Sequence, residues 1–219
     1  MTSLNSSIVS GVLERLYGEA ERTDSVVLPR VRAEAGRLGG AFDDRNVSAL
    51  LDDAFIPVAA EVGRLLYTLV RACRPTIAVE FGTSFGLSAI HIAAALRDNG
   101  SGKLIATELN QNKATRALEH IRQAGLGDLV EVRQGDAFKT LSGVKGIDFL
   151  MLDAWKGLYL PMLKNLEPVL NSGCLIVADD LKLFPEMLKP YVDYVRNPEN
   201  GYTSNELPID DGLEVSLRR

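Results

Sequence analysis

Residues 76–88, TIAVEFGTSFGLS, decide the fold. A short apolar run, Thr76 to Phe81, leads directly into a segment with two glycines, Gly82 and Gly86, and a helical pattern follows. Glycines between a strand and a helix let the backbone turn sharply beside a ligand. The stretch therefore predicts the first strand and the first binding loop of an α/β protein.

Beyond this stretch, short apolar runs alternate with longer helical patterns, as in the βαβ units of a parallel sheet. Seven strands are expected, at 76–81, 103–107, 130–133, 147–152, 174–178, 202–207 and 213–217. Only the segment from Pro208 to Gly212 separates the last two, which suits a tight hairpin. We therefore expect a mostly parallel sheet that ends in an antiparallel hairpin.

The first third of the chain, Met1 to about Arg74, has no convincing strand. Two helical faces are expected there, one formed by Ile8, Val12, Leu13 and Leu16 and one, in a helix over 58–72, by Val62, Leu65, Leu66 and Leu69. We expect a single domain over residues 1–219, in which a helical cap (1–74) precedes a Rossmann-like core (75–219). The amphipathic pattern of the cap by itself indicates only that one face of each helix is buried.

Composition excludes several classes of protein. The 219 residues are 46% hydrophobic and 24% charged, and no apolar run approaches the roughly 20 residues that span a bilayer. A net charge of -5 without a cluster of Lys and Arg argues against nucleic-acid binding. Cys73 and Cys174 are expected to be buried thiols, and His91 and His120 to be structural or solvated. We expect a cytoplasmic protein with neither a membrane nor a nucleic acid as partner.

The binding loop and the acids that follow it favour S-adenosylmethionine (SAM) over a dinucleotide. The dinucleotide fingerprint G-x-G-x-x-G needs glycine where this chain has Ser84. Glu108 ends the second strand and can accept both hydrogen bonds of a ribose diol. Asp136 can accept from the adenine amino group, and Ala137 leaves room for the ring. Glu80 adds a negative charge that suits a sulfonium cation. A final antiparallel strand is also usual in Rossmann-like methyltransferases, whereas dinucleotide-binding sheets normally stay parallel.

Three more acids end the next two parallel strands: Asp153, and the pair Asp179 and Asp180. The carboxyl ends of such strands face the ligand crevice, so the three carboxylates should gather at one rim. Their mutual repulsion calls for a cation, and oxygen ligands without Cys or His favour Mg²⁺ or Ca²⁺ over zinc, with Mg²⁺ preferred. Acids that merely cap the following helices are the alternative.

Together these residues resemble the motifs of the cation-dependent O-methyltransferases, the family of catechol O-methyltransferase and caffeoyl-CoA O-methyltransferase. The likeness covers about Phe55 to Arg219. The matching motifs are Glu80-Phe81-Gly82 with Gly86 and Ser88, then Glu108, Asp153-Ala154-Trp155-Lys156 with Tyr159, Ala178-Asp179-Asp180, and Asp211-Gly212-Leu213-Glu214. The resemblance implies a seven-stranded, Rossmann-like SAM-dependent methyltransferase fold.

The resemblance also implies roles for individual residues. Gly82, Ser88, Glu108, Asp136 and Ala137 would hold SAM, and Glu80, Ser84, Gly86 and Asp153 complete the candidate cofactor site. Asp153, Asp179 and Asp180 would ligate the metal, Lys156 would be the catalytic base beside Asp153, and Trp155 and Lys156 would face the substrate. A metal lowers the pKa of a phenol oxygen, and burial and the cation should lower the lysine pKa from about 10.4.

The chain departs from the family pattern at positions that concern the metal, the cofactor and the substrate. Asp180 stands where the family usually has Asn, Ala154 where the catechol enzyme has His, and Ile56 where relatives often have Met near SAM. The acid directed at the second catechol hydroxyl falls near Asn205 or Glu206.

The expected activity is SAM- and metal-dependent O-methylation of a small catechol-like phenol by a homodimer. The alternatives are a metal-independent N- or carboxyl-methyltransferase, whose rim acids bind the substrate, and an NAD-dependent oxidoreductase. A SAM-binding protein without enzymatic activity is a further alternative.

Overall fold

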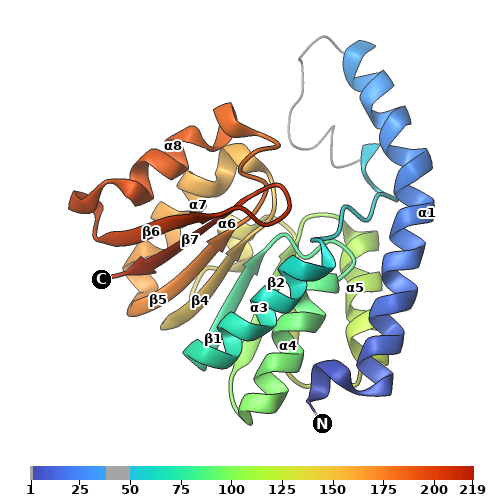
Figure 1. Ribbon diagram of the computed structural model, residues 1–219, viewed down its shortest axis with the longest axis horizontal. Helices are drawn as coiled ribbons and strands as arrows, with labels where there is room; N and C mark the ends of the chain where they lie inside the picture. Colours follow the sequence, from blue (N-terminus) through green and yellow to red (C-terminus); the bar gives the residue numbers. More distant parts are fainter. Residues whose placement is uncertain (1, 38–49) are drawn as a thin grey trace.

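The computed structural model describes residues 2–37 and 50–219 (Figure 1). Within these residues seven strands form one sheet in the order β3-β2-β1-β4-β5-β7-β6. The strands are β1 (Ile77–Phe81), β2 (Lys103–Glu108), β3 (Val130–Gln134), β4 (Ile147–Leu152), β5 (Leu170–Ala178), β6 (Tyr202–Leu207) and β7 (Leu213–Arg218). β1 to β5 run parallel, and β7 is antiparallel to both β5 and β6. The predicted sheet and its C-terminal hairpin are confirmed.

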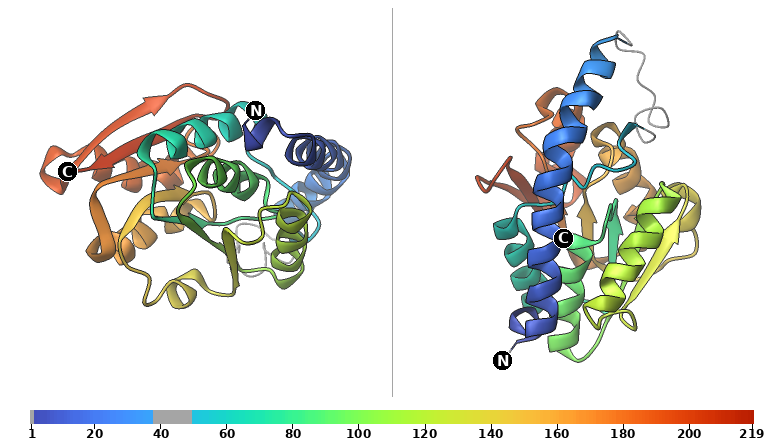
Figure 2. Two further views of the ribbon diagram at one scale, coloured as in Figure 1. Left: turned by 90° about the horizontal axis from the view of Figure 1, so that it is seen from below. Right: turned by 90° about the vertical axis from the view of Figure 1, so that its right-hand side faces the viewer.

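Helices cover both faces of the sheet (Figure 2). They are α1 (Ser7–Arg37), α3 (Ala60–Cys73), α4 (Leu87–Asn99), α5 (Gln111–Gln123), α6 (Ala137–Thr140), α7 (Tyr159–Leu166) and α8 (Pro185–Arg196). Short 3-10 helices span Ser3–Asn5, Lys156–Leu158, Glu167–Val169 and Pro198–Asn200. Residues of α1, α3, α4 and α5 share one hydrophobic cluster with the sheet, and those of α6, α7 and α8 share the other.

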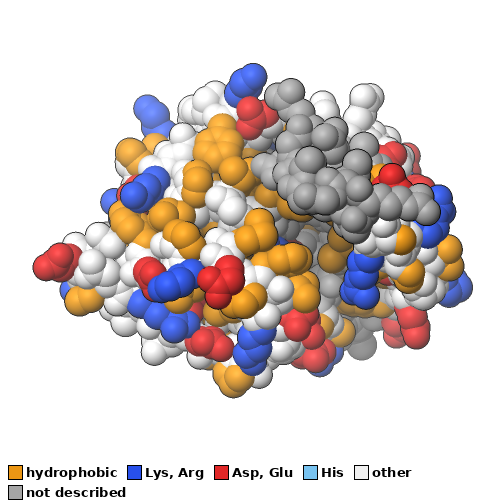
Figure 3. Space-filling view, turned by 90° about the horizontal axis from the view of Figure 1, so that it is seen from above, with side chains coloured by type: hydrophobic (Ala, Val, Ile, Leu, Met, Phe, Trp, Pro, Cys, Tyr) orange, Lys and Arg blue, Asp and Glu red, His pale blue; other side chains and the backbone are white. Residues whose placement is uncertain are grey.

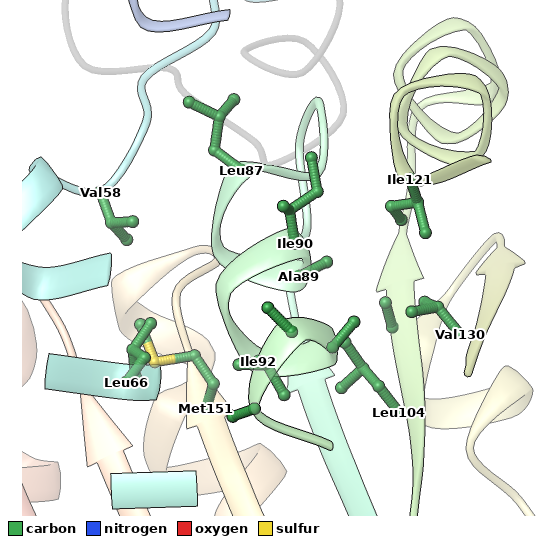
Figure 4. Packing of buried hydrophobic residues seen from close by; sticks show 14 of the residues in the cluster. Val58, Leu66, Leu87, Ala89, Ile90, Ile92, Leu104, Ile121, Val130 and Met151 are labelled. Carbon is green, nitrogen blue, oxygen red and sulfur yellow. The ribbon is translucent and has the colours of Figure 1, made fainter. Parts of the chain in front are cut away.

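The core between α3, α4 and the sheet is one continuous hydrophobic cluster, part of which is drawn in Figure 4. Leu66 of α3, Ile90 and Ile92 of α4, Leu104 of β2 and Met151 of β4 are all fully buried. Each such side chain contributes about 1.5–3 kcal/mol of hydrophobic stabilisation. The central strands β1, β2 and β4 are buried on both faces, as expected of parallel strands covered by helices, whereas β3 at the sheet edge is mostly exposed or half-buried.

The N-terminal helices form a layer of this fold. α1 and α3 run along one face of the sheet beside α4 and α5 (Figure 1). The expected apolar face of α1 was wrong at its start, because Ile8 is 61% exposed whereas Val9 is buried. The buried face is Val9, Leu13, Leu16 and Ala20, which is the i, i+4, i+7, i+11 stripe of a helix. Among the described residues no helix has the length and apolar character that crossing a membrane requires.

The cysteines and histidines have structural settings. Cys174 is buried, but Cys73 is exposed because it is the last residue of α3, so the expectation that both thiols are buried was wrong for Cys73; both are free. His91 Nδ1 lies 2.9 Å from Leu87 O, and His120 Nδ1 lies 2.9 Å from Phe85 O. Burial lowers the pKa of both imidazoles. These contacts agree with the structural role expected for the two histidines.

Candidate active site

The carboxyl ends of β1, β4 and β5 bring three loops together. The strand order reverses between β1 and β4, the point at which open α/β sheets bind ligands. Asp153 N donates to Phe81 O at 2.9 Å and Asp179 N donates to Leu152 O at 3.1 Å, so the ladder continues past the strands and fixes both acids. At Gly82, with φ +94°, a Cβ would lie 2.5 Å from Asp153 O. Only glycine therefore allows the β1–α4 loop to pack this closely against Asp153.

A buried lysine joins the acids into one cluster. Lys156 Nζ lies 3.1 Å from Asp153 Oδ1 and 2.6 Å from Asp180 Oδ2, and it donates to the Tyr159 hydroxyl at 2.8 Å. The lysine is only 8% exposed. The Tyr159 hydroxyl donates to Asp179 O at 3.4 Å, and Asp179 Oδ1 accepts from Asp180 N at 2.8 Å. The structure thus brings together Asp153, Lys156, Asp179 and Asp180, and it places the Tyr159 hydroxyl beside them.

Negative charge exceeds positive charge in this cluster. Burial raises the pKa of Asp153 to about 6, although the Lys156 ammonium lowers it. Burial, together with the charges of Asp153 and Asp180, raises the pKa of Asp179 to about 8. Burial lowers the pKa of Lys156, but Asp153, Tyr159 and Asp180 together raise it well above the usual value. The expected lowering of the lysine pKa was wrong for this arrangement, because two carboxylates face the ammonium directly.

The three rim acids do not form a preassembled metal centre. In residues 2–37 and 50–219, no group of three or more His, Cys, Asp or Glu side chains is arranged to hold a metal ion. The physical reason is the Lys156 ammonium, which pairs with both Asp153 and Asp180. The donor set nevertheless fits a hard divalent cation in chemistry and in charge, because three carboxylates share one ammonium and two of their pKa values are raised.

Beside this cluster, Glu108 organises the binding loop. Its carboxylate accepts from Ser84 N and from Asn110 N, both at 2.9 Å. Ser84 adopts φ +47°, and its hydroxyl donates to Phe55 O at 2.8 Å and accepts from Lys113 Nζ at 3.3 Å. The loop then enters α4, in whose first turn Gly86 (φ +91°) is the N-cap and Ser88 is buried. A carboxylate can accept about four hydrogen bonds, so Glu108 retains acceptor capacity for a ligand.

Glu80 lies near the carboxyl end of β1. It is 0% exposed, and neither carboxylate oxygen has a hydrogen-bond partner among the described residues. Burial raises its pKa to about 7, and the nearby hydroxyls of Ser88 and Thr83 lower it only in part. Burial thus disfavours the negative charge expected of Glu80 unless a cationic ligand lies beside it, and that charge stays a prediction.

The remaining candidate residues occupy the rim. Asp136 is the N-cap of α6, where it accepts from Phe138 N at 3.0 Å, and Ala137 is buried behind it. Trp155 is half-buried, immediately before the 3-10 turn that carries Lys156. The Glu206 carboxylate accepts from Arg196 Nη2 at 3.2 Å, so this acid is already paired.

Tyr159 is the main residue that the sequence analysis left out of the site. It is fully buried, and Tyr191 packs edge-on against it with ring centroids 5.9 Å apart. The signal was its position three residues after Lys156 at a helix start, a spacing that places two side chains on one face. The same spacing also fits ordinary packing, so the sequence alone did not distinguish the two.

Comparison with known proteins agrees with this geometry. Residues 79–181 match a family model described as a methyltransferase domain. The chain is 32% identical over 174 residues to catechol O-methyltransferase B of Danio rerio, an alignment that covers 73% of this chain and 64% of that protein. It is 33% identical over 132 residues to catechol O-methyltransferase of Sus scrofa, covering 57% of this chain and 70% of the relative.

A solved structure shares the fold. It is that of the O-methyltransferase TomG from Streptomyces achromogenes in complex with SAM, with a TM-score of 0.68 at 22% identity, covering 91% of this chain and 98% of that one. The order of the motifs, the sheet and the sequence relatives all lead to one assignment. The chain belongs to the cation-dependent family of SAM-dependent O-methyltransferases.

Proposed function

We propose that this protein transfers the methyl group of SAM to a hydroxyl of a small catechol-like phenol, with help from a divalent cation, preferably Mg²⁺. The observation that carries the proposal is the buried Lys156 between Asp153, Asp180 and Tyr159 at the carboxyl edge of the sheet. Two carboxylates face this amine directly and raise its pKa, so it suits proton abstraction when a bound cation offsets their charge.

The proposed cofactor site lies between the glycine loop and β2. Gly82, Ser84, Gly86 and Ser88 would contact the methionine part, Glu108 the ribose, and Asp136 with Ala137 the adenine, while Glu80 and Asp153 border the site. Two observations support the fit. The buried Glu80 oxygens have no hydrogen-bond partner in the part of the chain that the structure describes, which suits a cationic ligand. The Gly82 backbone passes too close to Asp153 for any side chain.

The substrate side is more apolar. Leu183, Phe184 and Met187 are 51%, 39% and 49% exposed, and Met187 Cε would lie 3.7 Å from a Cβ at Gly157, next to Lys156. Hydrophobic side chains are plentiful on this end of the molecule, among scattered charges (Figure 3). Together with Trp155, this edge suits a flat aromatic ring rather than a charged substrate.

In the proposed mechanism the residues of the chain hold the phenol and accept its proton. The neutral Lys156 amine would accept the hydroxyl proton, and Tyr159 would hold this amine toward the reacting oxygen. SAM would supply the methyl group and leave as S-adenosylhomocysteine, a neutral thioether. Asp153, Asp179 and Asp180 would hold the divalent cation, which would polarise the phenol oxygen and offset the charge that raises the lysine pKa. Trp155 would pack against the ring.

Removal of divalent cations tests the metal directly. We expect exhaustive EDTA treatment to abolish transfer of labelled methyl from SAM to a panel of phenols, and added Mg²⁺ to restore it. SAM binding, measured by calorimetry, should survive the chelation, because its proposed contacts are separate from most of the rim acids. Full turnover after chelation would contradict the metal role.

A metal-independent N- or carboxyl-methyltransferase is the second candidate. One observation favours it: Lys156 already neutralises part of the rim by pairing with Asp153 and Asp180. The remaining acids could then bind a cationic or hydrogen-bonding substrate. Calorimetric titration with Mg²⁺, Mn²⁺ and Ca²⁺ separates the two candidates, because this second function predicts no binding of a divalent cation.

Tyr159→Phe tests the proposed orientation of the base. It removes one hydrogen bond to Lys156 without changing the packed ring, so we expect kcat to fall about tenfold with SAM affinity unchanged. Tyr191→Phe is the matched control, because this ring is also buried but its hydroxyl has no hydrogen-bond partner within residues 2–37 and 50–219. If both variants lost activity equally, packing rather than orientation of Lys156 would be responsible.

A further inference from the structure

A carboxylate on α1 holds two consecutive backbone amides far along the chain. Asp24 Oδ1 accepts from Phe55 N at 2.7 Å and Asp24 Oδ2 accepts from Ile56 N at 2.8 Å. Both oxygens are engaged, and hydrogen bonds to an ionised acceptor are among the stronger ones in proteins. Asp24 therefore fixes the backbone of a segment that neither borders α1 in sequence nor belongs to a helix or strand.

The segment that Asp24 holds is strained. Ile56 has φ +43°, in the left-handed region, where a β-branched residue is a clear outlier. Ser84 of the binding loop, at φ +47°, is strained in the same way. Such conformations persist only where the surroundings hold them, and they gather at functional sites.

The two strained residues are connected. The Ser84 hydroxyl donates to Phe55 O at 2.8 Å, and the Phe55 and Phe85 rings stack with centroids 4.1 Å apart. Ser84 N then donates to Glu108 Oε2 at 2.9 Å. A continuous series of hydrogen bonds thus runs from Asp24 on α1 to the acid proposed to bind the ribose.

We propose that Asp24 is a positioning residue for the cofactor: by holding the Phe55–Ile56 backbone, it keeps Ser84 and Glu108 in their binding arrangement. The inference rests on the proposed SAM site and assigns α1 a part in it. Without Asp24, two backbone donors lose their acceptors, the Ile56 strain relaxes, and Phe55 O moves away from the Ser84 hydroxyl.

Asp24→Asn is the test. The Asn side chain has one acceptor oxygen, whereas the backbone N–H groups of Phe55 and Ile56 each donate to a separate oxygen of Asp24. We expect the Kd for SAM, measured by calorimetry, and the KM for SAM to rise about tenfold, with kcat at saturating SAM retained. Ser84→Ala breaks the same series at its other end. It should weaken SAM binding similarly, and the double variant should lose little more than either single variant.

Two further variants separate positioning from general stability. Ile56→Gly removes the strain, so it should recover part of the SAM affinity when combined with Asp24→Asn. Asp98→Asn is the matched control. Both Asp98 oxygens lie 3.0 Å from Ser3 N, so this acid also holds a distant backbone amide, but away from the binding loop. It should lower the melting temperature and leave SAM affinity unchanged.

The outcomes distinguish the inference from the function on which it rests. If the wild type fails to bind SAM, both the cofactor site and the role of Asp24 are overturned. If the wild type binds and Asp24→Asn binds equally well, only the role of Asp24 is overturned. An equal loss of affinity in Asp98→Asn, or no recovery with Ile56→Gly, would also overturn it.

Discussion

Lys156→Ala is expected to lower kcat for methyl transfer about a thousandfold, within the range that a positioned general base contributes. The amine is 8% exposed and lies within hydrogen-bonding distance of Tyr159, Asp153 and Asp180, so solvent has little access to replace it. The Kd for SAM should stay nearly unchanged, because the proposed contacts of Lys156 are with the substrate. Single-turnover kinetics with labelled SAM and direct calorimetry measure the two quantities separately.

Lys156→Arg separates the base from the ion pair. A guanidinium keeps the positive charge between the carboxylates but does not give up its proton in proteins, so stability should be largely retained while kcat stays low. Lys164→Ala on α7 is the control, because this exposed lysine contacts the Tyr194 ring, with its Nζ 4.8 Å from the ring centroid, and should not affect turnover. A Lys156→Ala enzyme with the wild-type rate would exclude Lys156 as the base.

The sheet was predictable because its strands carry strong local signals. β4 and β6 have the predicted bounds, Ile147–Leu152 and Tyr202–Leu207. β5 was predicted to begin at Cys174, yet it begins at Leu170. Its first half is mostly exposed and polar, with Asn171, Ser172 and Gly173, so backbone pairing extends it where the hydrophobic pattern does not.

The site was predictable as a set of positions but not as a set of interactions. Acids at the ends of parallel strands must share one edge, which is why Asp153 and Asp179 are close to each other. Whether a lysine or a metal ion neutralises these acids depends on side-chain rotamers and burial, which the sequence does not specify. The ion pair between Lys156 and Asp180 and the raised pKa of Asp179 arise from packing between loops distant in sequence. Packing also leaves the Glu80 oxygens without a hydrogen-bond partner among the described residues.

The contribution of α1 was also hidden from the sequence. Asp24 lies on a helix whose pattern indicates only that one face is buried, and its partners, Phe55 and Ile56, are about thirty residues away in a segment without periodicity. A carboxylate that binds backbone amides leaves no side-chain motif at the other end. A contact of this kind can be identified only in the structure.

The second large effect concerns stability and its dependence on pH, through Glu80. Burial raises the pKa of this carboxyl from 4.5 to about 7. Between these two values the folded state binds the proton more tightly than the unfolded state does. The free energy of unfolding therefore falls as pH rises from 4.5 to 7, by about 3 kcal/mol for a fully buried group. Below 4.5 the group is protonated in both states, and the penalty is absent.

Glu80→Gln should remove this contribution, because the amide does not titrate. Denaturant unfolding of both proteins at pH values between 4.5 and 7.5 gives the comparison, and the slopes due to Asp153 and Asp179 cancel in the difference. We expect the difference in free energy of unfolding, variant minus wild type, to rise by about 3 kcal/mol as the pH rises across this range. Thr83→Val removes a hydroxyl that lowers the pKa of Glu80. The pKa of Glu80 should therefore rise further in this variant, and the pH-dependent loss of stability should continue to higher pH. Parallel stability curves for wild type and Glu80→Gln would mean that the buried carboxyl keeps an ordinary pKa, with a cation or solvent reaching it.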